Sequence, residues 1–200
     1  MSFSWNRKLH YVHNNFKGRF YNIDPGVNWA NFIPIENRPI NYLEIGVADG
    51  GSAILVSKSY CKNPESKIYC VDPWFDYDDY PEYKDVQNNA WKNFNHNIET
   101  SGSFKKFIVN RGLSNVIVPK FKNEFFDIIY VDGNHETEYV YKDGLMAFQK
   151  AKKGGYIVFD DYNDYWPQTM KGVDQFLVEY SEKIRILTKS AFGQVIIQKI

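Results

Sequence analysis

The sequence predicts an α/β fold in which a mostly parallel sheet is covered by helices on both faces. Two observations support this class. From Asn41 onward, short apolar segments bounded by turn residues alternate with segments whose apolar residues recur at helical spacing. Near the C-terminus, two apolar segments are separated only by Lys189–Gly193, which is too short for a parallel crossover and therefore predicts an antiparallel hairpin.

The expected elements follow from this pattern. The strand candidates are Tyr42–Gly46, Ile68–Asp72, Lys106–Val109, Phe126–Val131, Gly155–Asp160, Ile184–Thr188 and Gln194–Gln198. The helix candidates are Ser52–Tyr60, Val86–Glu99, Glu136–Lys150 and Thr169–Tyr180. Residues 1–40 are mixed polar and aromatic with several prolines, and we expect a short helix or irregular cap there that serves as a lid. Residues 41–200 are expected to form one domain.

Composition narrows the class of function. The 200 residues include 24 basic and 24 acidic side chains, and this balance argues against a nucleic-acid partner. No apolar run approaches the roughly 18 residues of a membrane span, and the N-terminus lacks the apolar core of a signal peptide. Cys61 and Cys70 form no C-x-x-C pair, so we expect reduced thiols in a cytoplasmic protein. A homo-oligomer is compatible with these features.

A glycine-rich turn follows the first expected strand and precedes a helix. Glycines allow a tight turn and a close approach of a ligand to the main chain, and the free N–H groups of a helix N-terminus suit a nucleotide-like ligand. The residues expected to bind such a ligand are Glu44, Gly46, Gly50, Gly51 and Ser52. The alternative is a structural turn that binds nothing.

The second expected strand ends at Asp72, where a carboxylate can accept hydrogen bonds from both hydroxyls of a ribose. Trp74 follows two residues later and is expected to pack on an adenine ring. The alternative is an Asp-Pro turn with a tryptophan in the core. The segment Asn110–Ser114 follows the third strand, and we expect it to flank the adenine, so that Ser114 joins the binding residues.

Acidic residues follow the fourth and fifth strands. If these strands are neighbours, their ends lie roughly 5 Å apart, and Asp132, Asp160 and Asp161 converge at the carboxyl edge of the sheet. Crowded carboxylates repel one another unless a cation joins them, and oxygen ligands suit Mg²⁺. The alternative is that Asp160 and Asp161 cap a loop while Asp132 faces solvent.

His135 lies three residues beyond Asp132, in the loop before the next helix. An imidazole is suited to accept a proton at neutral pH, and such transfer typically contributes about 10²–10⁴ in rate. His135 is therefore the expected general base. The alternative is that it begins the following helix or serves as an additional metal ligand.

These motifs resemble a known family. Glu44-Ile45-Gly46 and Val71–Trp74 resemble the first two motifs of the class I S-adenosylmethionine-dependent methyltransferases, although Ala48 stands where the family usually has a glycine. The later segments Val131–His135 and Gly154–Tyr162 resemble the metal-dependent O-methyltransferases similar to the macrocin sugar methyltransferases.

The resemblance covers about Tyr42 to Ile200 and implies several properties. The fold would be Rossmann-like, with strand order 3-2-1-4-5-7-6 and an antiparallel last strand. The cofactors would be S-adenosylmethionine, with Asp132 among its contacts, and Mg²⁺. The activity would be methyl transfer to a hydroxyl of a small acceptor, most naturally a sugar.

Two other classes remain open. Gly46-x-Ala48-x-x-Gly51 nearly matches the dinucleotide fingerprint of NAD-dependent oxidoreductases, and Asp72 follows Gly51 by 21 residues. The acids on the fourth and fifth strands and the terminal hairpin count against that class. A non-catalytic nucleotide-binding module would keep the fold, but the convergent acids and His135 argue against it.

Overall fold

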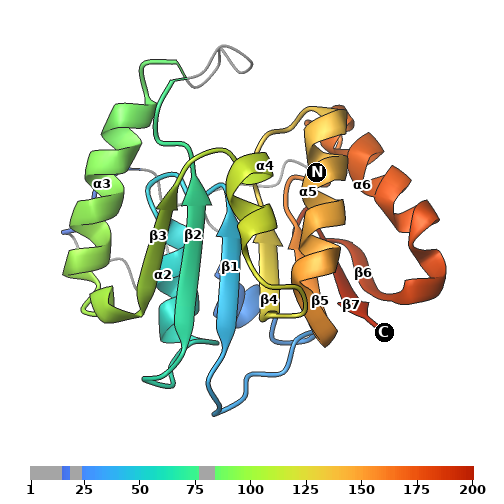
Figure 1. Cartoon of the computed structure of the whole chain (residues 1–200), viewed down its shortest axis with the longest axis horizontal. Helices are drawn as coiled ribbons and strands as arrows, with labels where there is room; N and C mark the ends of the chain where they lie inside the picture. Colours follow the sequence, from blue (N-terminus) through green and yellow to red (C-terminus); the bar gives the residue numbers. More distant parts are fainter. Residues whose placement is uncertain (1–14, 19–23, 77–83) are drawn as a thin grey trace, which may run out of the picture.

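The computed structural model of this chain describes residues 15–18, 24–76 and 84–200. Within these ranges a seven-stranded sheet has the order β3-β2-β1-β4-β5-β7-β6, as expected (Figure 1). The strands are β1 (Asn41–Ile45), β2 (Lys67–Asp72), β3 (Phe107–Arg111), β4 (Phe126–Val131), β5 (Ala151–Phe159), β6 (Ile184–Ala191) and β7 (Gln194–Lys199). The first five pair in parallel, and β7 runs antiparallel to both β5 and β6.

Helices cover both faces of the sheet. They are α1 (Pro25–Asn28), α2 (Gly51–Lys58), α3 (Gln87–Thr100), α4 (Ser114–Ile117), α5 (Thr137–Lys150) and α6 (Pro167–Glu179), with short 3₁₀ turns η2 (Phe104–Lys106), η3 (Val118–Lys120) and η4 (Ser181–Lys183). Figure 1 shows α4, α5 and α6 in front of the sheet and α2 behind it. The buried side chains form two clusters, one between the sheet and α1–α3, the other between the sheet and α5 and α6.

Successive residues of a strand feed opposite clusters. In β1, Tyr42 packs with the helices behind the sheet, whereas Leu43 and Ile45 pack with those in front. This alternation follows from the two-residue period of a strand. It explains why the central strands read as continuous apolar runs rather than as alternating patterns.

Two boundaries differ from the expectation for physical reasons. β6 continues to Ala191, so that only Phe192 and Gly193 form the hairpin turn, and both have positive φ angles of 60° and 75°. Two residues with φ above zero match the twist of a type I′ hairpin. The fifth strand was expected to begin at Gly155, but β5 begins at Ala151, so Gly154 and Gly155 lie inside it, where the register with β4 shifts. Glycine in a strand often marks such a bulge.

The described part of the N-terminal segment contributes to the core. Trp29 and Ile33 are buried with Tyr60 and Tyr130, and Trp29 Nε1 donates a hydrogen bond to Gln194 Oε1 at 2.8 Å. The rest of the expected lid, residues 1–14 and 19–23, lies outside the described residues, as do residues 77–83. In the part of the chain that the structure describes, no helix has both the length and the apolar character needed to cross a bilayer.

Candidate functional site

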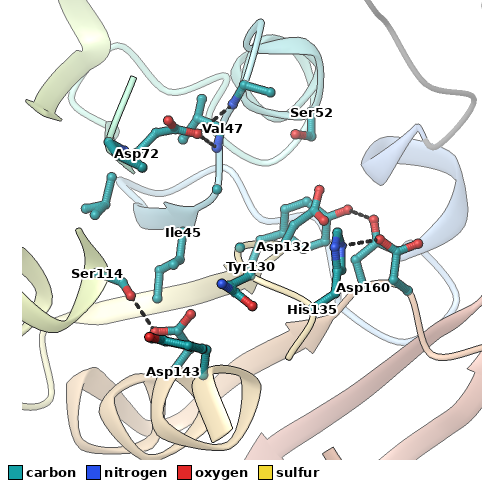
Figure 2. Close-up of a pocket in the computed structure, with 18 of the residues that line it drawn as sticks. Ile45, Val47, Ser52, Asp72, Ser114, Tyr130, Asp132, His135, Asp143 and Asp160 are labelled. Carbon is teal, nitrogen blue, oxygen red and sulfur yellow. Dashed lines mark hydrogen bonds and ion pairs between the residues drawn. The ribbon is translucent and has the colours of Figure 1, made fainter. Parts of the chain in front are cut away.

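A cavity of about 640 Å³ opens at the carboxyl ends of the central strands (Figure 2). Its walls come from the glycine-rich turn after β1, the end of β2, the start of α4, and the loops that follow β4 and β5. Ligands of open α/β sheets bind at this edge, where the strand order reverses. The cavity therefore gathers most of the residues that the sequence singled out.

Gly46 allows the turn after β1 to lie directly against the end of β4. Its φ angle is +82°, and a Cβ atom at this position would stand 1.8 Å from the carbonyl oxygen of Asp132. The Asp132 amide donates a hydrogen bond to the Ile45 carbonyl at 2.8 Å, which continues the β1–β4 pairing. The glycine is therefore needed for the approach of two loops.

Glu44 does not line the cavity, contrary to expectation. Its side chain is 0% exposed and accepts hydrogen bonds from the hydroxyls of Ser52 at 2.5 Å and Tyr42 at 2.6 Å. Burial raises the pKa of Glu44 to about 7, against the opposing effect of these two hydrogen bonds. Glu44 thus anchors the first turn of α2 from behind, while Gly46, Gly51 and Ser52 reach the cavity and Gly50 does not.

Asp72 lines the cavity and also fastens the glycine-rich turn. Its Oδ2 accepts hydrogen bonds from the amides of Val47 at 2.8 Å and Ala48 at 2.9 Å. Its Oδ1 accepts a hydrogen bond from the Trp74 amide at 2.9 Å. Burial raises the pKa of Asp72, and the three amide donors oppose this rise. The carboxylate therefore holds the ends of β1 and β2 together.

Trp74 belongs to the core, so the expectation that it packs on an adenine is wrong. The ring is 0% exposed and its centroid lies 5.0 Å from that of Trp91 and 4.6 Å from that of Phe94. Its Nε1 donates a hydrogen bond to the Ala48 carbonyl at 2.8 Å. A φ angle of +46° at Trp74 turns the chain so that the indole points under the glycine-rich turn.

Three side chains meet on the other side of the cavity. One ligand atom each of Asp132, His135 and Asp161 lies within 4.8 Å of the other two, and His135 Nε2 lies 2.9 Å from Asp161 Oδ2. The imidazole also stacks on Trp166, with a centroid distance of 4.1 Å and an interplanar angle of 20°. Asp161 has a φ of +54°, a left-handed conformation that turns its side chain toward the histidine.

Asp160 is not part of this group, which corrects the expected set of three carboxylates. Its oxygens accept hydrogen bonds from the Tyr130 hydroxyl and from Gln194 Nε2, the latter at 3.1 Å. Burial and the charge of Asp161 raise the pKa of Asp160 to about 6. Burial, followed by the charges of Asp160 and Asp161, raises the pKa of Asp132 well above its usual range.

The structure adds residues that sequence analysis did not single out. Asp143 on α5 lines the cavity and accepts a hydrogen bond from Ser114 Oγ at 2.6 Å. Tyr139, Trp166 and Phe192 supply aromatic walls. The sequence held one signal for Asp143, because this acid stands three residues after Val140 and four before Ala147, on the apolar stripe of a helix.

This doubly wound sheet, with a glycine-rich turn and a cavity at its carboxyl edge, is the architecture in which open α/β folds bind ligands. The chain belongs to the methyltransferase domain family, whose model matches residues 43–162. It is 30% identical over 181 residues to the protein R132 of Acanthamoeba polyphaga mimivirus, covering 86% of this chain and 75% of that protein.

Solved methyltransferase structures share the fold. The O-methyltransferase TomG of Streptomyces achromogenes, in complex with S-adenosylmethionine, matches with a TM-score of 0.61 and 14% identity, over 82% of this chain and 74% of that chain. The methyltransferase PaMTH1 of Podospora anserina, bound to S-adenosylhomocysteine, matches with a TM-score of 0.57 and 19% identity, over 81% and 72%. The O-methyltransferase NovP matches with a TM-score of 0.60 and 18% identity, over 82% and 73%.

Proposed function

We propose that this chain transfers a methyl group from S-adenosylmethionine to a hydroxyl oxygen of a small acceptor. The observation that carries the proposal is the shape of the site. One cavity joins the glycine-rich turn and Asp72 to the group formed by Asp132, His135 and Asp161. The bound sulfonium would supply an activated methyl group, so the protein must bind the nucleoside, orient the acceptor and take up its proton. The ligands named for TomG and PaMTH1 support this choice.

Asp72 is the proposed ribose-binding residue. Two of its lone pairs hold the Val47 and Ala48 amides and a third holds Trp74. A carboxylate has about four acceptor sites, so one site remains, which can accept from one hydroxyl of the ribose but not from both. Asp72→Ala should weaken the binding of S-adenosylhomocysteine roughly ten- to a hundredfold, the cost of a charge-assisted hydrogen bond. Isothermal titration calorimetry measures this affinity.

Asp127→Ala is the matched control for Asp72→Ala. Asp127 is also buried and also accepts a backbone hydrogen bond, from the Asn41 amide at 2.8 Å, but it lies at the amino edge of the sheet. Its loss should lower the melting temperature and leave the affinity for S-adenosylhomocysteine within about twofold. Unchanged affinity in a folded Asp72→Ala protein would remove Asp72 from the binding site.

His135 is the proposed general base. The acceptor hydroxyl must lose its proton during methyl transfer, and His135 carries a nitrogen that can receive it. Asp161 fixes the ring through its 2.9 Å contact with Nε2, and Trp166 fixes the plane by stacking. A ring nitrogen of His135 also lies within 4.8 Å of a carboxylate oxygen of Asp132 and of Asp161. If that nitrogen bound a metal ion instead, its lone pair could not take up the proton of the acceptor.

The carboxylates of Asp132 and Asp161 fit a divalent cation, and the imidazole of His135 lies beside them. Carboxylate oxygens suit Mg²⁺ and also admit Mn²⁺. Burial and the neighbouring charges of Asp160 and Asp161 raise the pKa of Asp132, and a cation would offset the repulsion between these charges. A bound cation would lower the pKa of an acceptor hydroxyl. We propose Mg²⁺ at this position.

Removal of divalent ions tests this site. Treatment with excess chelator should reduce methyl transfer at least tenfold, because the cation then no longer offsets the charge near the acceptor. Added Mg²⁺ should restore the rate in the wild-type protein but not in Asp161→Asn. Full activity in excess chelator would exclude the ion from the reaction.

The acceptor is proposed to be a sugar or another small hydroxyl compound. Trp166, Phe192 and Tyr139 present rings to the cavity, and aromatic rings stack on sugars and on phenols. The zero net charge of the chain gives no attraction for a polyanion.

A further inference from the structure

We propose that Asp143 selects an adenine base by accepting a hydrogen bond from its exocyclic amino group. The inference rests on the proposed function, since it assigns the base end of the S-adenosyl ligand. It assigns a role to a residue on α5, a helix that also contributes Tyr139 to the wall of the cavity.

Asp143 combines deep burial with access to the cavity. Asp143 is 3% exposed, yet it lines the cavity. Its Oδ1 accepts a hydrogen bond from Ser114 Oγ at 2.6 Å, and this is its one side-chain hydrogen bond among the residues that the structure describes. Figure 2 shows the Ser114–Asp143 pair on the side of the cavity away from Asp160.

Gly133 leaves the second carboxylate oxygen open. A Cβ atom at position 133 would stand 3.2 Å from Asp143 Oδ2, so a larger residue there would press against this oxygen. Among the described residues, Ser114 is the one side chain that donates to this carboxylate, and it does so at Oδ1. No buried side-chain oxygen in the described part of the chain lacks a hydrogen-bond partner, so Oδ2 is open to the cavity, where it can accept from a donor on a ligand.

The position of Asp143 fits the base of a nucleoside held at Asp72. Asp72 ends β2, and Ser114 begins α4 directly after the neighbouring strand β3. A ribose at Asp72 therefore places its base toward Ser114. The walls between these points include the apolar residues Ile45, Pro73 and Leu113, which suit the faces of a planar ring.

The chemistry of the carboxyl group distinguishes adenine from its deaminated form. Adenine presents an amino group that donates to a carboxylate, whereas hypoxanthine presents a carbonyl oxygen at the same position and would face Oδ2 with a second acceptor. Burial raises the pKa of Asp143 to about 7, against the hydrogen bond from Ser114. Both protonation states keep an oxygen that accepts from the amino group.

Calorimetry with S-adenosylhomocysteine and S-inosylhomocysteine tests the proposal on the full chain. Wild-type protein should bind the adenosyl ligand at least tenfold more tightly than the inosyl ligand. Asp143→Asn should narrow this ratio to about twofold or less, because its amide can donate to the carbonyl of hypoxanthine. Asp127→Asn is the matched control and should keep the wild-type ratio, since Asp127 is a similarly buried carboxylate that does not line the cavity.

The possible outcomes distinguish a failure of this inference from a failure of the proposed function. Equal affinity of the wild-type protein for both ligands would overturn the role of Asp143, even if Asp143→Asn failed to fold. Equal weakening of both ligands in a folded Asp143→Asn protein would also overturn it, because that result indicates a purely structural residue. Binding of neither ligand by the wild-type protein would instead refute the proposed function.

Discussion

Replacing His135 by alanine is expected to lower kcat about a hundredfold or more, with the affinity for S-adenosylhomocysteine nearly unchanged. The acceptor hydroxyl is a very weak acid, and the imidazole is held at the cavity wall by Asp161 and Trp166. Steady-state kinetics measure kcat, and calorimetry measures the affinity for S-adenosylhomocysteine.

His96→Ala serves as the control, because His96 lies on α3 and does not line the cavity. The affinity for Mn²⁺ must be measured for both variants. Near-normal turnover of His135→Ala would refute the assignment of His135 as the general base. Activity lost only in proportion to Mn²⁺ affinity would assign His135 as a metal ligand instead.

Gly46→Ala should cause the largest loss of stability, about 3 kcal/mol or more in the free energy of unfolding. A non-glycine residue with φ near +82° costs roughly 1–2 kcal/mol. In addition, the new Cβ would stand 1.8 Å from the backbone oxygen of Asp132, so β1 and β4 would have to separate where they form the cavity. Chemical denaturation measures the change.

Gly154→Ala is the control that isolates the backbone strain. Gly154 has a similar φ of +78°, and a Cβ atom placed on it would meet no other atom within 4 Å. Gly154→Ala should lower the free energy of unfolding by about 1–2 kcal/mol. The difference between the two variants then measures the cost of the clash between a Cβ atom at position 46 and Asp132. Equal losses of stability in the two variants would show that the loops at the ends of β1 and β4 can move apart at little cost. That result would contradict the close packing of Gly46 on Asp132.

The sequence predicts the sheet and the edge of it at which the cavity lies. Central strands buried on both faces read as apolar runs, and the short distance between the last two strands leaves only a hairpin. Turn and acidic residues fall at strand ends, and parallel strands bring those ends together. The presence of Asp72, Asp132, His135 and Asp161 around one cavity follows from these local features. The strand order was expected from the family resemblance, and the structure confirms it.

The direction of individual side chains does not follow from such patterns. Asp160 and Asp161 are adjacent, yet one turns to Tyr130 and the other to His135 because Asp161 adopts a left-handed backbone. Trp74 points into the core for a similar reason. Asp143 reaches the cavity only because α5 packs beside Gly133, a tertiary contact that helical periodicity cannot show.

The central claim is methyl transfer from S-adenosylmethionine to a hydroxyl acceptor, and labelled transfer tests it most directly. The purified chain is incubated with methyl-labelled S-adenosylmethionine, Mg²⁺ and separate pools of sugars, phenols, nucleic acid and protein. We expect label in a sugar or phenol pool, released as an O-methyl product, with His135→Ala reduced about a hundredfold. Binding of NADH without binding of S-adenosylhomocysteine, or label in nucleic acid alone, would contradict the account.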